Sequence, residues 1–418
     1  MNRRKRRKKH FYATSQVFLQ MLIIVLVILV LVAAFLIHKT STEGPGSLGV
    51  IGTNNTDVDN PPNNSESKET AEPPDLITAV TTAPPLGPIE ENQLYDGFEL
   101  PINGATGYAS LATEVREGPA DSFEIILNLE PGDVFTILSL SGDWLQIKTG
   151  AVVGWMPSIQ CMVNLPDVVP SIVYNDTNAY SSLFRASELT IKGITGEKLY
   201  DAKAFNPRLN REEFIMPVLI PAAKKLCLAQ QNALKFGRTL IVYEAYRPYE
   251  TQMTVASAVK SMAKVNSVVN KGLNDGEWST TWFIATSLSN HQMGFAFDVS
   301  LGNITKYERT TVGKYTFNRV TAYNKCLMPT EMHELSTKAI NYQYPYSSTK
   351  KTGWQNIPLA ETMTEDAKLL RYICTGAGLT PLASEWWHFN DLDTYTMVKD
   401  NHCIGGFYTS VCVSTLPD

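Results

Sequence analysis

Two short segments in the last third of the chain contain residue types that bind metal ions and activate water. The first reads Ser-Asn-His-Gln-Met-Gly-Phe-Ala-Phe-Asp and contains His291 and Asp298; the second reads Glu-Trp-Trp-His-Phe and contains Glu385 and His388. Zinc prefers imidazole nitrogen and carboxylate oxygen, and a catalytic zinc site keeps one position open for water. These residues therefore supply a ligand set for zinc, with one acidic residue left over to act on the water.

The spacing within each segment predicts the local shape of the backbone. Gly294 lies between His291 and Asp298, and glycine tolerates the angles that bend a chain around a metal ion. Glu385 and His388 are three positions apart, so a helix or turn puts them on one face whereas a straight strand points them oppositely. We therefore expect a bend or a strand end there.

An alternative interpretation is a catalytic triad of Ser289, His291 and Asp298. The members of a triad come from anywhere in a chain, so closeness in sequence does not support one. No G-x-S-x-G elbow surrounds Ser289 either. The metal site is therefore the favoured interpretation.

Together with Tyr246-Arg247-Pro248, the two segments form a pattern that resembles a known family. The pattern S-x-H-x-x-G-x-A-x-D followed by E-x-W-H is similar to that of the zinc D-alanyl-D-alanine peptidases (peptidase family M15), which include vancomycin-resistance dipeptidases and carboxypeptidases. The resemblance covers roughly residues 171–400. It implies the following zinc ligands: His291, Asp298 and His388.

The same resemblance implies roles for residues outside the ligand set. Glu385 becomes the catalytic base, and Arg247 the residue that steadies the reacting carbonyl; the alternative for Arg247 is a surface ion pair with Glu244 or Glu250. The candidate substrate-binding residues are Ser289, Tyr246 and His333.

Two departures from the family pattern bear on the substrate. Glu244 stands where the dipeptidases usually have Asp, which keeps the charge. His333 aligns with an Asp that holds the free amino terminus of the dipeptide in those enzymes, although Glu331 is close enough in sequence to substitute. Loss of a buried charge partner costs several kcal/mol, on the order of 3–5. The change therefore favours a longer, acylated substrate such as a peptidoglycan stem.

The amino-terminal residues have the pattern of a membrane anchor. Residues 3–9 are all Arg or Lys, and residues 17–37 are apolar except for Gln20. Such a run is long enough to span a bilayer, and the basic block before it places the amino terminus in the cytoplasm. A cleaved signal peptide is the alternative, but no clear cleavage site follows. We expect a cell-membrane protein whose catalytic domain is extracellular.

The charge of the exported part argues against nucleic acid as a partner. The chain has 36 Lys+Arg and 41 Asp+Glu, a net charge of −5. Without the basic residues 3–9, the net charge falls to about −12. An acidic surface is poorly suited to binding polyanions.

Composition divides the chain into five predicted parts. They are a cytoplasmic tail (1–16), a transmembrane helix (17–37), a disordered stalk rich in Pro, Asn and Ser (38–100), a β domain (101–168) and the peptidase domain (169–418). The β domain has short strands at 125–127, 134–138, 144–147 and 152–155, separated by turns, and resembles a bacterial SH3-like domain. Trp144 and Trp155 could form a ligand platform, but buried tryptophans in the core of a small barrel are an equally good interpretation.

The peptidase domain is predicted to be α+β. Apolar residues from Leu219 to Phe236 recur at helical spacing before Gly237, and a strand at 240–243 follows. A second helix is expected from Thr364, a plausible N-cap, to about Cys374, with Gly376 as its end. The resemblance adds a small antiparallel sheet flanked by helices, of the hedgehog-like type. Residues 257–282 are an insertion, which either decorates the surface or forms a wall of the substrate groove.

The six cysteines allow fifteen disulfide patterns, among which Cys403–Cys412 is the preferred pair. Neither residue lies in the ligand motifs, so a cysteine-peptidase mechanism has little support. Buried thiols remain an alternative for Cys227 and Cys374.

These observations predict a membrane-anchored D,D-carboxypeptidase that binds one Zn²⁺ and removes the terminal D-alanine from peptidoglycan stems. A D-Ala-D-Ala dipeptidase with the same site is the nearest alternative, and a non-catalytic wall-binding protein is the third. Iron or cobalt suits similar ligands.

Overall fold

A mostly antiparallel sheet brings together the segments that contain the two motifs. The computed structural model describes residues 86–418. The strand order in this sheet is β18-β19-β15-β14-β8, with β16 paired to β15, and only the β14–β8 pair is parallel. The strands are β8 (Val173–Tyr174), β14 (Arg238–Glu244), β15 (Ala296–Val312), β16 (Tyr315–Lys325), β18 (Thr380–Pro381) and β19 (His388–Asn390).

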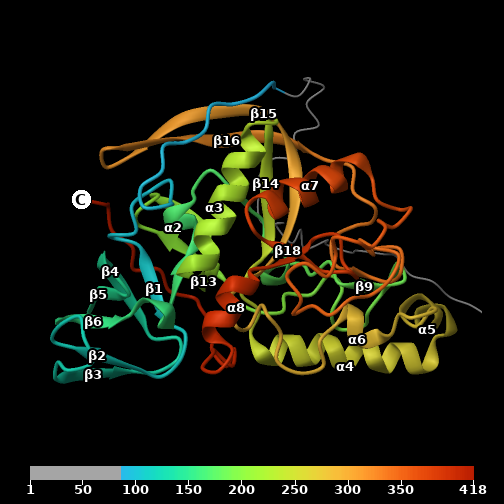
Figure 1. The fold of residues 1–418 in the computed structure, drawn as a ribbon, viewed down its shortest axis with the longest axis horizontal. Coiled ribbons are helices and arrows are strands. Elements are labelled where there is room, and N and C mark those ends of the chain that lie inside the picture. Colours follow the sequence, from blue (N-terminus) through green and yellow to red (C-terminus); the bar gives the residue numbers. More distant parts are fainter. Residues whose placement is uncertain (1–85) are drawn as a thin grey trace, which may run out of the picture. The chain divides into compact units, whose positions relative to one another are not determined.

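Two helices pack against this sheet where the sequence predicts helices (Figure 1). The first, α3 (Ile220–Leu234), is followed by Gly237 at φ +65°, as expected of a glycine after a helix end. The second, α7 (Glu365–Gly376), begins after Thr364, whose hydroxyl accepts a hydrogen bond from the N–H of Ala367. Both predictions are confirmed, and the α+β class is confirmed with them.

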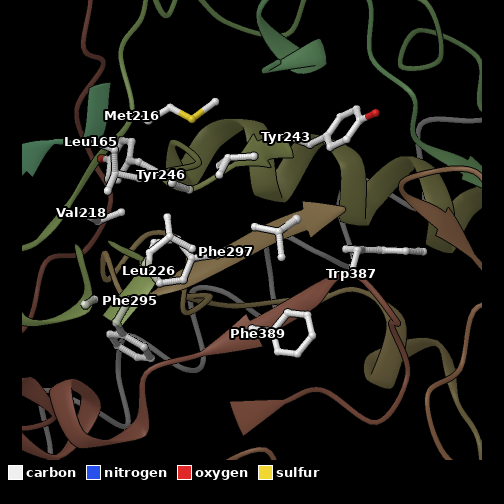
Figure 2. Packing of buried hydrophobic residues seen from close by; sticks show 14 of the residues in the cluster. Leu165, Met216, Val218, Leu226, Tyr243, Tyr246, Phe295, Phe297, Trp387 and Phe389 are labelled. Carbon is white, nitrogen blue, oxygen red and sulfur yellow. The ribbon is translucent and has the colours of Figure 1, made fainter. Parts of the chain in front are cut away.

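The core lies between α3 and one face of the sheet. Successive residues of a strand point to opposite faces, so Phe297 and Phe389 face away from their neighbours Asp298 and His388. Both aromatic side chains are fully buried and share a cluster with Leu226 of α3 (Figure 2). The apolar side chains on one face of the sheet pack into the core. The polar side chains Asp298 and His388 therefore lie on the opposite face.

The predicted insertion 257–282 is mainly helical. It contains the end of α4 (Tyr249–Val265), all of α5 (Ser267–Leu273) and the start of α6 (Thr280–Phe283). Asn266 caps α5 by accepting hydrogen bonds from the N–H groups of Val268 and Val269. The last helix, α8 (Leu392–Val398), begins directly after β19 and is capped by Asp391.

A second sheet of eight strands precedes the peptidase part. Its order is β13-β7-β1-β4-β5-β6-β2-β3. Its strands are β1 (Thr106–Ala109), β2 (Thr113–Arg116), β3 (Ile125–Leu129), β4 (Val134–Ser141), β5 (Trp144–Thr149), β6 (Val152–Pro157), β7 (Cys161–Asn164) and β13 (Pro217–Leu219). The four predicted strands are confirmed in β3 to β6, while the SH3-like assignment stays a prediction. Because β13 lies beyond residue 168, this sheet includes chain from the predicted peptidase domain.

Short elements complete the part of the chain that the structure describes. They are β9 (Arg185–Ala186), β10 (Leu189–Thr190), β11 (Lys203–Asn206), β12 (Arg211–Phe214), β17 (Glu334–Leu335), α2 (Leu165–Val168), and the 3-10 turns η1 (Ser158–Gln160) and η2 (Thr177–Ala179).

The packed chain begins before residue 101. Phe98 and Leu100 are fully buried, although the predicted stalk extends to residue 100. Leu86 donates a backbone hydrogen bond to Ile304 in the long β15–β16 hairpin, along which this segment runs (Figure 1). Between residues 86 and 418 no helix has the length and apolarity to cross a membrane; the predicted span 17–37 lies outside the described residues.

The preferred disulfide between Cys403 and Cys412 does not form. All six cysteines are free thiols, and all except Cys412 are buried. Cys227 and Cys374 lie inside α3 and α7, as the alternative of buried thiols predicts.

Candidate metal centre

Three polar side chains of the centre lie in a row across neighbouring strands. Asp298 on β15 is paired on one side with Glu244 of β14 and on the other with His388 of β19. Residues directly opposite each other in an antiparallel pair point to the same face of the sheet. The register alone therefore puts these three side chains together, although the first and the last are 144 positions apart along the chain.

His291 reaches the same place from the turn that precedes β15. Gly294 adopts φ +82° in this turn, so the predicted glycine bend is confirmed. A side chain at this position would also lie 2.5 Å from the Cε of Met162, which belongs to β7 of the other sheet. The turn ends as β15 begins, so His291 faces back over Asp298.

The donor atoms converge and carry lone pairs rather than protons. His291 Nε2 lies 3.1 Å from His388 Nδ1, and Asp298 Oδ1 lies 3.3 Å and 2.9 Å from these two nitrogens. His291 Nδ1 is 2.9 Å from the carbonyl oxygen of Ala245, and His388 Nε2 is 3.0 Å from Asn390 Oδ1. Both outer nitrogens therefore hold the proton, as in histidines that bind metal ions.

This donor set fits a divalent cation. Two imidazole lone pairs and a carboxylate oxygen that face one another repel unless a cation or a proton lies between them. All three residues are buried, with exposed fractions of 2%, 1% and 7% for His291, Asp298 and His388. Burial alone would raise the pKa of Asp298, but its contacts with His291, His333 and His388 hold that pKa well below its usual range. Two nitrogens and one oxygen are the ligand chemistry that zinc prefers.

Glu385 lies at the edge of the same site. It occupies a turn immediately before β19, so the predicted strand end between Glu385 and His388 is confirmed. One carboxylate oxygen is 3.8 Å from His388 Nδ1, and the backbone carbonyl of Glu385 accepts a hydrogen bond from Asn341. Burial raises the pKa of Glu385 to about 8. The group is therefore poised to exchange a proton near neutral pH.

Arg247 lines the site as a buried ion-pair partner. Its Nε donates to Glu244 Oε2 over 2.7 Å, and its Nη2 donates to the same oxygen and to Asp298 Oδ2, 3.2 Å away. Nη1 donates to Gln252 Oε1. A guanidinium has five N–H donors, so these contacts leave one donor of Nη1 for a ligand in the pocket. The predicted alternative pair with Glu244 is present, but it is buried rather than on the surface.

Glu244, Asp298 and His333 form a second group of possible ligand atoms. Within it, the guanidinium of Arg247 already contacts both carboxylates through Nη2. A second cation there would have to displace a buried arginine. The second group is therefore satisfied by Arg247, and only the first group needs a metal ion.

His333 lines the pocket and contacts Asp298, one of the candidate ligands. Its Nε2 lies 3.0 Å from Asp298 Oδ2, the oxygen that faces away from His291. Its ring stacks on Phe184, with centroids 4.3 Å apart. The side chain is fully buried, and the backbone adopts φ +60°. Donation from His333 thus orients the carboxylate of Asp298.

These residues line one pocket of about 250 Å³. Ser289 lines it, and its buried hydroxyl has no hydrogen-bond partner among the described residues, so the alternative triad with His291 does not form. Apolar walls come from the following side chains: Phe184, Trp282, Phe283, Ile284, Leu288, Leu335, Leu382 and Trp387. Trp282 belongs to the insertion 257–282, which therefore contributes to the groove.

Tyr246 does not line the pocket. Its ring stacks on Phe407 with centroids 4.7 Å apart, and its hydroxyl donates to the carbonyl oxygen of Phe407. The hydroxyl thus has an acceptor within the protein, and the ring packs on Phe407 rather than in the pocket. The predicted substrate contact of Tyr246 is not supported by this geometry.

A family model described as D-ala-D-ala dipeptidase, Peptidase_M15, matches residues 218–404. This stretch is similar to that family. It contains all three candidate ligands, Glu385 and Arg247. The match supports a zinc D-Ala-D-Ala peptidase-type function in general, that is, a metallopeptidase hydrolase. A search of curated proteins finds no match to the chain.

Sequence reasoning missed the residues that hold the ligands in place. Asn390 fixes the proton on His388, and Asn290 in turn donates to Asn390 Oδ1 over 2.8 Å. Gln252 holds Nη1 of Arg247. Asparagine and glutamine occur throughout the chain, so the sequence gives no signal for these supporting residues. They are recognised only by their position next to a candidate ligand or Arg247 in the structure.

Proposed function

We propose that this protein is a D,D-carboxypeptidase that removes the terminal D-alanine from peptidoglycan stem peptides. The convergence of two unprotonated imidazole nitrogens and a carboxylate beside Glu385 carries this proposal. We further propose that His291, Asp298 and His388 hold one Zn²⁺. The match to the D-ala-D-ala dipeptidase family over residues 218–404 supports both.

The residues of the pocket account for hydrolysis. A zinc ion held by His291, Asp298 and His388 would supply Lewis-acid chemistry, which polarises a carbonyl and lowers the pKa of water. Glu385 accepts a proton from water as the oxygen attacks the carbonyl carbon, and returns it to the leaving amine nitrogen when the C–N bond breaks. The free N–H of Arg247 stabilises the negative charge that develops on the carbonyl oxygen.

The charges of the pocket favour an acylated substrate over a free dipeptide. Among the described residues, Asp298 and Glu385 are the only carboxylates that line the pocket. Asp298 is engaged by Arg247 and three histidines, and Glu385 is required as the base. Glu331 is exposed and lines a different pocket, so it does not replace the aspartate missing at 333. A free ammonium group would be left without a partner.

We propose that the amino-terminal segment anchors the protein in the cell membrane and that the catalytic part lies outside the cell. The basic run 3–9 before the apolar run 17–37 supports this orientation. The stem peptide is available to an enzyme on that side of the membrane.

The test is release of D-alanine from a soluble pentapeptide stem by the full-length protein. We expect release that a chelator abolishes and zinc restores. The Glu385→Ala variant should lose activity by about 10²–10⁴-fold, the usual contribution of a general base, while it keeps its zinc.

Glu331→Ala is the matched control, because this exposed glutamate lies outside the pocket. It should keep full activity. Faster hydrolysis of free D-Ala-D-Ala than of the stem would instead identify a dipeptidase. No hydrolysis of either substrate by zinc-loaded protein would overturn the proposal in favour of a binding protein.

A further inference from the structure

A cluster of buried polar residues lies directly behind Arg247. Strands β8 and β14 run parallel, so their carboxyl ends meet at the same edge of the sheet. Glu244 ends β14 there, and the chain that leaves β8 forms η2, with Asp176 as its N-cap and Asn178 within it. Tyr200 reaches the same edge from a loop. All four side chains are buried, with at most 7% of their surface exposed.

Glu244 connects this cluster to the catalytic arginine. Its Oε2 accepts both hydrogen bonds from Arg247. Its Oε1 accepts one bond from Asn178 Nδ2 over 2.9 Å and one from the Tyr200 hydroxyl over 2.7 Å. Each oxygen thus has two donors, which fixes the plane of the carboxylate and hence the plane of the guanidinium.

Asp176 completes the cluster as a second carboxyl group. Its two oxygens lie 3.3 Å and 3.1 Å from the Tyr200 oxygen. Tyr200 has one proton, which the shorter contact assigns to Glu244. Asp176 must then donate to the Tyr200 oxygen, which requires a protonated carboxyl. Burial first, and then the charge of Glu244, raise the pKa of Asp176 well above its usual range, in agreement with this assignment.

We infer that Tyr200, held by Asp176, is a positioning residue that fixes Glu244 and through it Arg247 for the reaction. Residues 176–200 lie outside the stretch that matches the peptidase family. The inference rests on the proposed function. It assigns to this preceding segment the task of holding the arginine rigid, so that the guanidinium does not reorganise as negative charge develops.

The test compares two buried tyrosines in the full-length protein. Tyr200→Phe removes the hydroxyl that donates to Glu244. Tyr174→Phe is the control, because Tyr174 is equally buried but donates to the backbone carbonyl of Val169. We expect Tyr200→Phe to lower kcat about tenfold with KM changed less than twofold, since the lost interaction acts in the transition state. Tyr174→Phe should change kcat less than twofold.

A second readout does not depend on activity. The ¹⁵Nε–H resonance of Arg247, assigned by its loss in Arg247→Lys, reports the bond to Glu244. It should shift and exchange faster with water in Tyr200→Phe, but not in Tyr174→Phe. Asp176→Asn should keep kcat within threefold, because the amide donates to Tyr200 as the protonated carboxyl does, whereas Asp176→Ala should match Tyr200→Phe.

The outcomes separate this inference from the proposed function. An inactive wild-type protein whose Arg247 resonance still responds to Tyr200→Phe would refute the function and keep the positioning. Equal kcat and an unchanged Arg247 resonance in both tyrosine variants would refute the positioning. Should Tyr200→Phe fail to fold, Asn178→Ala, which removes the other donor to Oε1, carries the same expectation.

Discussion

At the scale of single residues, the candidate metal centre depends on which nitrogen of each histidine ring, in His291 and His388, holds the proton. The carbonyl of Ala245 and the side chain of Asn390 hold the protons of His291 and His388 on the outer nitrogens. The inner nitrogens are therefore available as ligands without any proton release. Neutral partners outside the ligand set thus prepare the site before a cation arrives.

The variant His333→Asp tests the proposal that residue 333 selects the amino terminus of the substrate. In His333→Asp, a carboxylate enters a pocket in which the present carboxylates are both engaged, so a free ammonium gains a partner. We expect the ratio of kcat/KM for free D-Ala-D-Ala to that for the acylated stem to rise at least tenfold, or about 1.4 kcal/mol.

The ratio is the useful measurement because it cancels a loss of bound metal. Such a loss is expected as well, since Asp298 loses the donor that lies 3.0 Å from its Oδ2. His402→Asp is a control, because the ring of this histidine lies outside the pocket and its Nδ1 pairs with the backbone carbonyl of Lys399 near the surface. An unchanged ratio in His333→Asp would show that residue 333 does not select the substrate.

At the scale of elements, α7 delivers the chain to the segment that carries Glu385 and His388. Its N-cap Thr364 accepts from Ala367 N–H over 3.1 Å and donates to the carbonyl of Leu327 over 2.7 Å. Thr364→Ala should lower the free energy of unfolding by about 1 kcal/mol, the usual contribution of an N-cap. Urea denaturation measures it, and Thr364→Ser should restore most of the loss because it keeps the hydroxyl. A loss of equal size in Thr364→Ser would mean that the methyl group matters instead.

At the scale of the whole described unit, the carboxyl-terminal residues 403–418 connect the two sheets. Phe407 stacks on Tyr246 beside Arg247, and a side chain added at Gly132, in the turn before β4, would lie 2.8 Å from the Cβ of Phe407. Further along, the carbonyl of Val413 accepts from Thr136, and Thr415 donates to Gly104. This segment has no regular secondary structure, so its contacts alone keep it in place (Figure 1).

Phe407→Ala should therefore destabilise the protein by about 3–5 kcal/mol, as expected of a buried phenylalanine replaced by alanine. It should also lower kcat, because Tyr246 loses its stacking partner next to Arg247. Tyr408→Ala removes an adjacent aromatic ring that is 53% exposed, and it should change both quantities little. Thermal unfolding and D-alanine release measure the two effects. Equal behaviour of the two variants would show that the stack contributes nothing.

A buried carboxyl group gives the unit a predictable pH dependence. Glu99 is fully buried and accepts hydrogen bonds from neutral donors, namely Asn92, Ser171 and Gln231, and no residue between 86 and 418 forms an ion pair with it. Burial raises its pKa above the usual value despite these bonds. The folded state then binds this proton more tightly than the unfolded state, so its contribution to stability falls as pH rises from the unfolded pKa through the folded pKa.

The matching experiment is urea denaturation of wild type and Glu99→Gln between pH 5 and pH 8. The free energy of unfolding of the wild type should fall more over this interval than that of the variant, whose amide does not titrate. Parallel pH profiles would show that folding does not raise the pKa of Glu99 into this range.

The sequence alone was sufficient to name the candidate ligands and to predict the two helices α3 and α7. Histidine, aspartate and glutamate at these spacings have few other uses in combination, and the glycine bend and the turn at 385–388 follow from local backbone preferences. The helices α3 and α7 follow from apolar periodicity and from their end signals, which are local too. The candidate ligand set was therefore predictable before any fold was known.

Only the tertiary structure decided how these parts meet. The register that aligns Glu244, Asp298 and His388 joins strands far apart in sequence, and no local pattern specifies it. The same holds for Tyr246, whose hydroxyl turns to the distant Phe407 rather than to the pocket, and for Tyr200, which reaches Glu244 from outside the motifs. Residue types set the chemistry because they carry the ligand atoms, whereas their placement came from contacts between segments that are remote along the chain.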